Sequence, residues 1–301
     1  KRSQGVFMKI LVYIISLVFL GSIATAGEVK NKIYNSASEQ LSHGISKIIP
    51  GEGVTEVSVR FTEEKDDNLD FSILAVRDIL SQDNSNFFTQ FSIHNTEVNN
   101  DDRIVGNIGL GYRLLSPDNS YMFGINSFYD QDLRDEHARA SIGLEAKAKM
   151  IDVSINKYQK ATNMIVVNGN EEQVMSGWDY NISSQLPHMP WAIFNYEGYR
   201  TEKEKASSVL EGRVYSLELA INPVLQLDLS LDNATTDGVE DVIAAKVNFI
   251  YPPKDKEYTM VGGLSENTFE TRDMKDELKD KIRRNNRLTV EVQGAVIITS
   301  K

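Results

Sequence analysis

The sequence predicts an all-β membrane protein, an outer-membrane barrel of about twelve antiparallel strands. Segments of about ten residues alternate apolar and polar side chains, and a tilted strand of about that length crosses a bilayer. Short turns tend to alternate with longer polar loops, as they do in outer-membrane barrels. Beyond the N-terminal region, no run of about eighteen apolar residues occurs, which excludes a helical membrane protein.

The clearest alternation lies in four successive segments. They are residues 103–115, 121–130, 138–147 and 151–158. In the first segment, Ile108 and Leu110 oppose Asn107 and Arg113. Because successive side chains of a strand point to opposite faces, this period indicates strands with one apolar and one polar face. A soluble β-sandwich has the same alternation, so these segments by themselves leave that fold open.

The N-terminal residues have the three-part layout of a secretory signal peptide. A basic start precedes the apolar residues 10–20, and small residues before Gly27 provide a small-x-small cleavage site. We therefore expect residues 1–26 to be a signal peptide that is cleaved between Ala26 and Gly27. The alternative, an uncleaved membrane anchor, is disfavoured because the apolar core is short for a spanning helix.

Residues 27–52 are expected to form a short amphipathic helix in the periplasm. Apolar side chains recur at every third or fourth position, as on one face of a helix. They are Ile33, Ala37, Leu41, Ile45 and Ile48. Pro50 and Gly51 end the pattern. Two positions for this helix stay open, the barrel mouth and the membrane surface.

Residues 53–251 are expected to form the transmembrane barrel, with its polar face toward the lumen. The polar side chains assigned to the lumen are Arg113, Arg139, Glu145, Asp152, Asp179, Glu197, Glu218, Asp228 and Lys246. The apolar side chains assigned to lipid are Leu110, Leu144, Val153, Phe194, Leu219, Leu227, Leu229 and Val247. Because the lumen residues carry both signs of charge, the pattern argues against a strongly ion-selective channel.

The pattern changes after Tyr251. Pro252 and Pro253 break the strand, and residues 267–284 have the spacing of a helix, with apolar side chains four residues apart. We expect residues 252–287 to be a linker whose helix lies in the pore. Residues 288–298 are predicted to form one more strand.

Composition excludes several kinds of chemistry. The net charge of −11 argues against nucleic acid as the main partner. The absence of cysteine removes disulfides, thiolate metal sites and cysteine nucleophiles. The chain contains neither a Gly-x-Ser-x-Gly elbow nor a His-Glu-x-x-His metal motif. We assign no catalytic residue, cofactor or metal ligand. His137, beside Asp135 and Glu136 in a predicted loop, is a weak hydrolase candidate for which a charged turn is the better interpretation.

Several short motifs follow one another between residues 55 and 291. They are Gly109-Leu110-Gly111-Tyr112-Arg113, Gly124-Ile125-Asn126-Ser127-Phe128-Tyr129-Asp130, Ser141-Ile142-Gly143-Leu144-Glu145-Ala146, Gly177-Trp178-Asp179, Tyr196-Glu197-Gly198-Tyr199 and Arg284-Asn285-Asn286-Arg287. In type and order they resemble the β-domain of the intimin/invasin group, the inverse autotransporters.

The resemblance implies a twelve-stranded bacterial outer-membrane barrel with its N-terminus in the periplasm. In that family a linker runs through the pore and carries surface domains that bind host cells or other bacteria. For this chain, the resemblance implies a C-terminus at the cell surface. The expected partners are outer-membrane lipid, the barrel-assembly and periplasmic chaperone machinery, a host-cell or bacterial surface ligand, and a second copy in a homodimer.

The chain departs from the family pattern at its C-terminus. Residues 288–301 are too few for an immunoglobulin-like domain of about 100 residues, and we expect them to be a passenger stub. The sequence therefore predicts a translocator or anchor barrel with a minimal passenger, and the family's adhesive activity is not carried over. The alternative is a passenger-less structural or pore-forming barrel that exports a separate partner.

Overall fold

The computed structural model describes residues 51–62, 70–98, 101–203, 205–206, 209–236, 239–253, 259–293 and 295–297. The expected signal peptide, its cleavage site and the expected helix in residues 27–50 lie outside the described residues. Among those described, no helix is long and apolar enough to cross a membrane.

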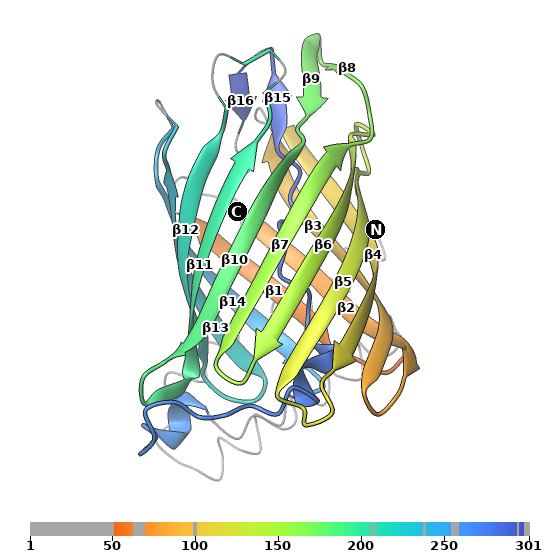
Figure 1. Ribbon diagram of the computed structural model, residues 1–301. Helices are drawn as coiled ribbons and strands as arrows, with labels where there is room; N and C mark the ends of the chain where they lie inside the picture. The colour runs from red at the N-terminus through yellow and green to blue at the C-terminus, as the bar shows by residue number, and fades with distance from the viewer. Residues whose placement is uncertain are drawn as a thin grey trace, which may run out of the picture.

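Twelve antiparallel strands close into a barrel, which confirms the predicted fold class (Figure 1). The strands are β1 (Thr55–Thr62), β2 (Asp70–Ser81), β3 (Ser85–Val98), β4 (Asp101–Leu115), β5 (Tyr121–Asp132), β6 (Ala138–Ala148), β7 (Ile151–Lys160), β10 (Gly177–Leu186), β11 (Met189–Thr201), β12 (Glu211–Ala220), β13 (Leu225–Ala234) and β14 (Val242–Tyr251). Strand β1 pairs with both β2 and β14, so the sheet has no free edge. Closure pairs the backbone groups that lipid cannot satisfy.

The two ends of the barrel differ in their connections. At one end, five links of two to five residues join neighbouring strands; we call this the short-turn end. At the other, the long-loop end, residues 161–176 form the longest link and contain the hairpin of β8 (Ile165–Val167) and β9 (Asn170–Val174). Strand β1 begins and β14 ends at the short-turn end, because Thr55 pairs with Tyr251.

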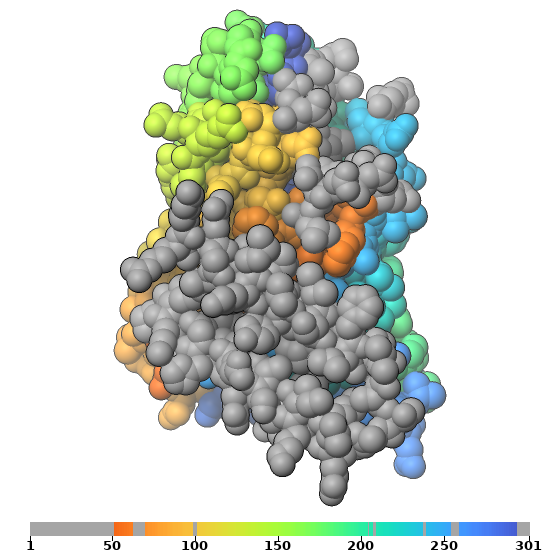
Figure 2. Space-filling model, turned by 180° about the vertical axis from the view of Figure 1, so that it is seen from behind, coloured from red at the N-terminus to blue at the C-terminus, as the bar shows by residue number. Residues whose placement is uncertain are grey.

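A second sheet lies at the long-loop end. Its order is β16-β15-β9-β8, where β15 is Val290–Val292 and β16 is Ala295–Ile297. Figure 2 shows the β8–β9 hairpin in green beside β15 in dark blue, above the barrel. The single strand predicted for residues 288–298 is therefore a short hairpin, and its partner is a loop of the barrel domain.

The linker helix predicted in residues 267–284 is wrong. Only two short 3-10 turns form in the described part of the linker, η1 (Met260–Gly262) and η2 (Asp276–Lys279). The helical spacing has another cause. Met274 and Leu278 pack against Leu115 and Met122, while Ile282 packs against a separate apolar cluster that includes Phe88 and Phe128. The apolar side chains match sites on the barrel wall instead of one face of a helix.

The outer face carries a band of exposed apolar side chains. Of the residues assigned to lipid, five are 40–54% exposed on this face: Leu110, Leu144, Val153, Phe194 and Leu229. The other three, Leu219, Leu227 and Val247, are partly buried and lie opposite one another on β12, β13 and β14. A contiguous apolar band of this kind is typical of a surface in contact with lipid.

Two glycines of β4 make room for aromatic rings in the lumen. A Cβ on Gly109 would lie 2.4 Å from the Phe128 ring, and one on Gly111 would lie 2.4 Å from the Phe88 ring. Both rings in turn lie under arginine guanidinium groups, Phe88 under Arg113 and Phe128 under Arg284. The glycines of the Gly-x-Gly-Tyr-Arg motif thus shape the lumen wall.

The two faces of β13 can be tested with one substitution at adjacent positions. Leu229→Arg places a charge on the outer face at mid-strand and should cost about 2–4 kcal/mol. Ser230→Arg places the same side chain in a polar lumen cavity and should cost much less. Denaturant titration of barrels folded in lipid vesicles measures both, and equal losses would contradict the assignment of the faces.

Candidate functional site

The C-terminal segment passes through the barrel from one end to the other. At the short-turn end, the Met274 backbone N–H donates to the Asn119 carbonyl. At the long-loop end, Leu288 packs against Val105 and Val174. We call residues 276–288 the lumen segment; Figure 1 shows this stretch inside the barrel. The site is therefore a lumen occupied by the chain's own C-terminal part.

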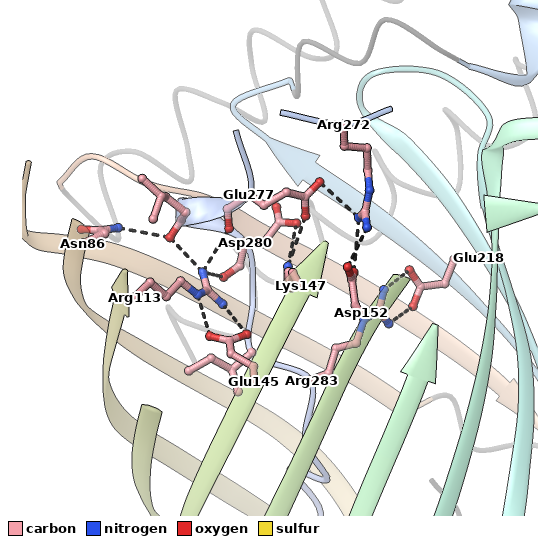
Figure 3. A network of polar contacts seen from close by, with 12 residues as sticks. Asn86, Arg113, Glu145, Lys147, Asp152, Glu218, Arg272, Glu277, Asp280 and Arg283 are labelled. Carbon is pink, nitrogen blue, oxygen red and sulfur yellow. Dashed lines mark hydrogen bonds and ion pairs between the residues drawn. The ribbon is translucent and has the colours of Figure 1, made fainter. Parts of the chain in front are cut away.

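Arg113 holds the lumen segment near the short-turn end. Its side chain is fully buried on β4, and its Nε and Nη2 donate to the two carboxylate oxygens of Glu145 at 2.7 and 3.1 Å (Figure 3). The remaining Nη1 donates to the carbonyl oxygens of Leu278 and Asp280 at 2.8 and 2.6 Å. A guanidinium has five N–H donors in a fixed fork, so one arginine binds a carboxylate and a backbone together.

Ion pairs attach the segment to the wall around Arg113. Lys147 on β6 contacts Glu277 and Asp280 at 3.2 and 3.5 Å. Arg283 pairs with Glu218 on β12, at 2.5 and 3.1 Å (Figure 3). Just before the segment, Arg272 makes a two-pronged pair with Asp152 on β7. The contacts come from both sides of the lumen, so the segment is bound between opposite walls.

Asp130 forms a second centre nearer the long-loop end. Its carboxylate accepts from Arg139 on the neighbouring strand at 2.8 and 3.0 Å and from Arg284 of the segment at 2.6 and 2.9 Å. The Asp130 side chain is fully buried. Arg139 also donates to the Asn285 carbonyl at 2.8 Å. The Arg284 guanidinium lies 4.2 Å from the centroid of the Phe128 ring, a cation–π geometry.

Wall and segment are complementary in charge along this path. The segment presents Lys281 and Arg287 in addition to Arg283 and Arg284, and each meets an acidic side chain of the wall. Lys281 donates to Glu56 at 2.7 Å, and Arg287 donates to Asp70 at 2.9 Å. Most of the surface of these side chains is buried, and a buried charge needs such a partner.

The structure places all nine polar residues assigned to the lumen on the inner face. Arg113, Arg139, Asp152 and Glu218 bind the segment or its approach, and Glu145 orients Arg113. The others, Asp179, Glu197, Asp228 and Lys246, line a lumen cavity of about 290 Å³. This cavity lies beside the segment, toward β10–β14 and β1–β3.

Sequence reasoning missed the residues that complete the site. Asp130, Tyr158 and Asn156 contact the segment from inner-face positions, and Arg283 and Arg284 contact the wall from the segment. Asp130 is two residues from Phe128, so both side chains lie on the inner face of β5. The period of the strand was therefore a sufficient signal for Asp130. The cations of the segment lie outside the alternating strands, in and beside the region that was interpreted as a helix, so the strand period gave no signal for them.

A buried charge cluster lies at the long-loop end. Arg103 on β4 donates to Glu172 on β9 at 2.9 Å and contacts Asp132 and Asp135 at 3.4 and 3.2 Å. The Nε2 of His137 lies 3.2 Å from Glu172. Burial lowers the pKa of His137 and outweighs its carboxylate neighbour. Its enclosure makes His137 a structural group that packs the hairpin, not an accessible hydrolase base.

Among the residues that the structure describes, no group of three or more His, Cys, Asp or Glu side chains is placed to hold a metal ion. What the described lumen offers is a set of buried donors and charges that bind a polypeptide.

Comparison with known proteins identifies the family. The family model described as "Inverse autotransporter, beta-domain" matches residues 21–286. The chain belongs to this family. The family and the closed barrel together place this inverse autotransporter β-domain in the bacterial outer membrane.

Three relatives have names that fit the family. The putative attaching and effacing protein homolog of Escherichia coli K12 is 30% identical over 187 residues, which cover 60% of this chain and 61% of that protein. The inverse autotransporter adhesin YeeJ of the same strain is 38% identical over 108 residues, 35% of this chain and 4% of YeeJ. Invasin of Yersinia enterocolitica is 28% identical over 194 residues, 60% of this chain and 22% of invasin.

The chain thus spans between 4% and 61% of the length of these three relatives.

A solved structure from the study "Unveiling the Mechanism Behind the in-meso Crystallization of Membrane Proteins" is similar in fold. The match covers 80% of this chain and 99% of the solved chain, with a TM-score of 0.63 and 19% identity. At that identity, the likeness shows the fold.

Loss of Arg113 should destabilise the inverse autotransporter β-domain strongly. Arg113→Ala leaves the Glu145 carboxylate buried without its partner, which costs about 3–5 kcal/mol. Arg134→Ala is the matched control, because Arg134 pairs with Asp101 but is 52% exposed; its loss should cost about 1 kcal/mol or less. Refolding titrations in lipid vesicles measure both. Similar costs would contradict the role of Arg113 as a buried anchor.

The charge cluster predicts acid sensitivity at the long-loop end. The pKa of His137 is lowered when the cluster is closed, so an opened cluster binds a proton more readily as pH falls below the ordinary value of 6.5. The closed state therefore loses stability toward low pH. Protection of the β9 amides against hydrogen exchange, corrected for intrinsic rates, should fall between pH 7 and 5 in the wild type.

In His137→Gln the fall of protection toward low pH should be absent across this range. Burial raises the pKa of Asp135 in the same cluster. That contribution is present in both proteins and cancels in their difference. An equally steep loss of protection in His137→Gln would mean that another group is responsible.

Proposed function

We propose that this barrel is a translocator and anchor that carries its C-terminal segment through the lumen from the periplasm to the cell surface. The observation that carries the proposal is the continuous path of the lumen segment. It starts beside the short turn at Asn119, follows Arg113 and Asp130, and reaches β9 at the long-loop end.

The difference between the two ends of the barrel supports this orientation. Outer-membrane barrels keep short turns on the periplasmic side and longer loops outside. With that orientation, the start of β1 and the end of β14 lie on the periplasmic side, and β15 lies at the surface. Residues 53–251 are then the membrane domain and residues 252–287 are the linker, while residues 288–301 begin the exported part.

The mechanism that we propose involves no covalent chemistry. Donors such as Arg113 and Arg139 bind main-chain carbonyl groups, which every residue carries, so these donors suit an extended chain of varied sequence. The acidic side chains of the wall match the cations of this particular segment. The lumen segment fills part of the interior, which supports an occupied translocator over an open pore. Assembly would use the barrel-assembly and periplasmic chaperone machinery that serves other outer-membrane barrels.

The names of the relatives suggest the purpose of export. Invasin and the adhesin YeeJ are named for attachment or entry, and the chain covers only a small share of each. We propose that the exported part of this protein likewise contacts a host-cell or bacterial surface ligand. The second candidate, a structural or pore-forming barrel that exports a separate partner, is supported only by the lumen cavity beside the segment.

The position of the C-terminus tests the proposal. An epitope placed after Lys301 should be reached by antibody on intact cells, because the path leads to the long-loop end. A second epitope in the short turn at Asp118 should react only after the outer membrane is opened. A C-terminal epitope that also requires opening would contradict export and favour the pore-forming alternative.

A further inference from the structure

The chain that leaves the lumen pairs at once with the β8–β9 hairpin. Three residue pairs join β15 to β9, with Glu291 opposite Gln173 at the centre. Backbone hydrogen bonds extend the ladder at both ends: Met175 donates to Thr289 at 3.0 Å, and Gln293 donates to Glu171 at 2.8 Å. Five consecutive residues, 289–293, therefore lie along residues 171–175, and β16 then folds back on β15.

Both faces of the emerging strand have partners. On one face, Val290 and Val292 pack against Val98 at the end of β3. On the other face, the Glu291 carboxylate accepts from the Lys205 backbone N–H at 2.7 Å. A slip of one residue would turn Glu291 toward the apolar site, because the side-chain period of a strand is two. The exit site therefore selects one register.

The hairpin that offers this edge is fixed to the barrel independently of the emerging strand. The bonds of Arg103 and His137 to Glu172 join β9 to β4 and to the β5–β6 link. All three side chains are at least 98% buried. A buried bidentate arginine–carboxylate pair holds both groups in one geometry. The edge of β9 is thus a rigid surface to which an extended chain can add a strand.

We propose that β9 is a template strand that captures the exported polypeptide by strand addition, opposes its return into the lumen and starts its folding, with β16 as the next strand. The proposal rests on the proposed function, because it needs the chain to arrive from the lumen. Its ligand is an extended segment with apolar side chains at alternate positions, as at Leu288, Val290 and Val292. Strand addition to an exposed sheet edge is an established way to bind a peptide.

The physical reason lies in the kind of contact at each place. Inside the lumen, Arg113, Arg139, Asn86 and Asn107 bind backbone carbonyl groups, which recur at every residue. Such backbone contacts form again after a shift of the chain, whereas the lumen's ion pairs to Lys281, Arg283, Arg284 and Arg287 have to exchange partners. At the exit, side chains such as Val290 occupy specific sites, so a shift loses them. A chain held at the exit end can move back only after the strand pairing breaks.

Proline substitution tests the pairing. In an antiparallel ladder, alternate residues direct their backbone groups to the same neighbour, so Gln173 faces β15 together with Glu171 and Met175. Gln173→Pro removes the backbone N–H that Gln173 directs to β15. Gln173→Ala keeps the donor and controls for the lost amide side chain, which bonds to Thr162.

A second control removes a donor from the same hairpin. Val166→Pro places a proline on the outer strand β8, where Val166 is 66% exposed and lies opposite Glu171. Because Glu171 directs its backbone groups to β15, the Val166 N–H points away from β9. This variant changes the hairpin without changing the edge that receives β15.

The measurement is the fraction of pulse-labelled, folded barrels whose epitope after Lys301 is reached by surface antibody at a fixed time. Gln173→Pro should lower this fraction several-fold, while Gln173→Ala and Val166→Pro should match the wild type. If Gln173→Pro exposes its epitope as fast as the wild type, the template role is wrong and export itself stands. If the wild-type epitope never reaches the surface, the proposed function fails.

A variant of the exported side covers the case in which Gln173→Pro folds poorly. Val292→Asp leaves the barrel wall unchanged and puts a carboxylate into the apolar site beside Val98. The template role predicts the same several-fold delay for Val292→Asp, and an unchanged rate would overturn it. Because the chain has no native cysteine, the pair Gln173→Cys with Glu291→Cys should also form a disulfide at the surface. A cross-link that fails to form would contradict the pairing.

Discussion

A polypeptide can lie inside a barrel only when its charges and backbone groups find partners there, and this constraint governs the structure. A buried charge without a partner costs several kcal/mol, and the lumen contains many buried charges that need partners. Arg113 with Glu145 and Asp130 with two arginines show how the constraint is met. In each case the wall forms an ion pair of its own, and one member of that pair also binds the segment. The barrel and its occupant are therefore one electrostatic unit.

The same constraint explains why the linker is not a helix. A helix uses its carbonyl groups internally, whereas Leu278, Asp280 and Asn285 use theirs to accept hydrogen bonds from arginine side chains of the wall. Every donor that the wall directs inward favours an irregular, extended backbone. The 3-10 turn at Asp276–Lys279 is the longest helical piece in the described linker because the wall satisfies the rest.

The two ends of the path bind the chain in different ways. The lumen combines donors that recognise any backbone with ion pairs to the segment's cations, while the exit uses a strand edge and apolar contacts that recognise a particular register. Between them, the cavity toward β10–β14 leaves one side of the segment in contact with polar, solvent-sized space. The wall holds the segment on one side, and the cavity leaves room on the other. This arrangement suits a segment that passes through the lumen and then remains bound there.

The sequence by itself determined the strands, the two faces and the sorting of turns. These features are local, because a period of two follows from strand geometry. The apolar or polar character of each face follows from its surroundings, lipid outside and the polar lumen inside. The assignment of Leu229 and Arg113 to opposite faces needed no knowledge of their neighbours. Motif order was enough to indicate the family, and the family match over residues 21–286 confirmed it.

Only the tertiary structure decided what the C-terminal residues do. The spacing of Met274, Leu278 and Ile282 predicts a helix, yet these side chains fit separate sites on the wall. The pairing of Arg284 with Asp130 joins residues 154 positions apart, and no local pattern contains that information. The β8–β9 hairpin became a partner for β15 because barrel closure brings residues 165–174 to the place where the lumen opens. Contacts of this range depend on the closed barrel, which is why sequence periodicity could not supply them.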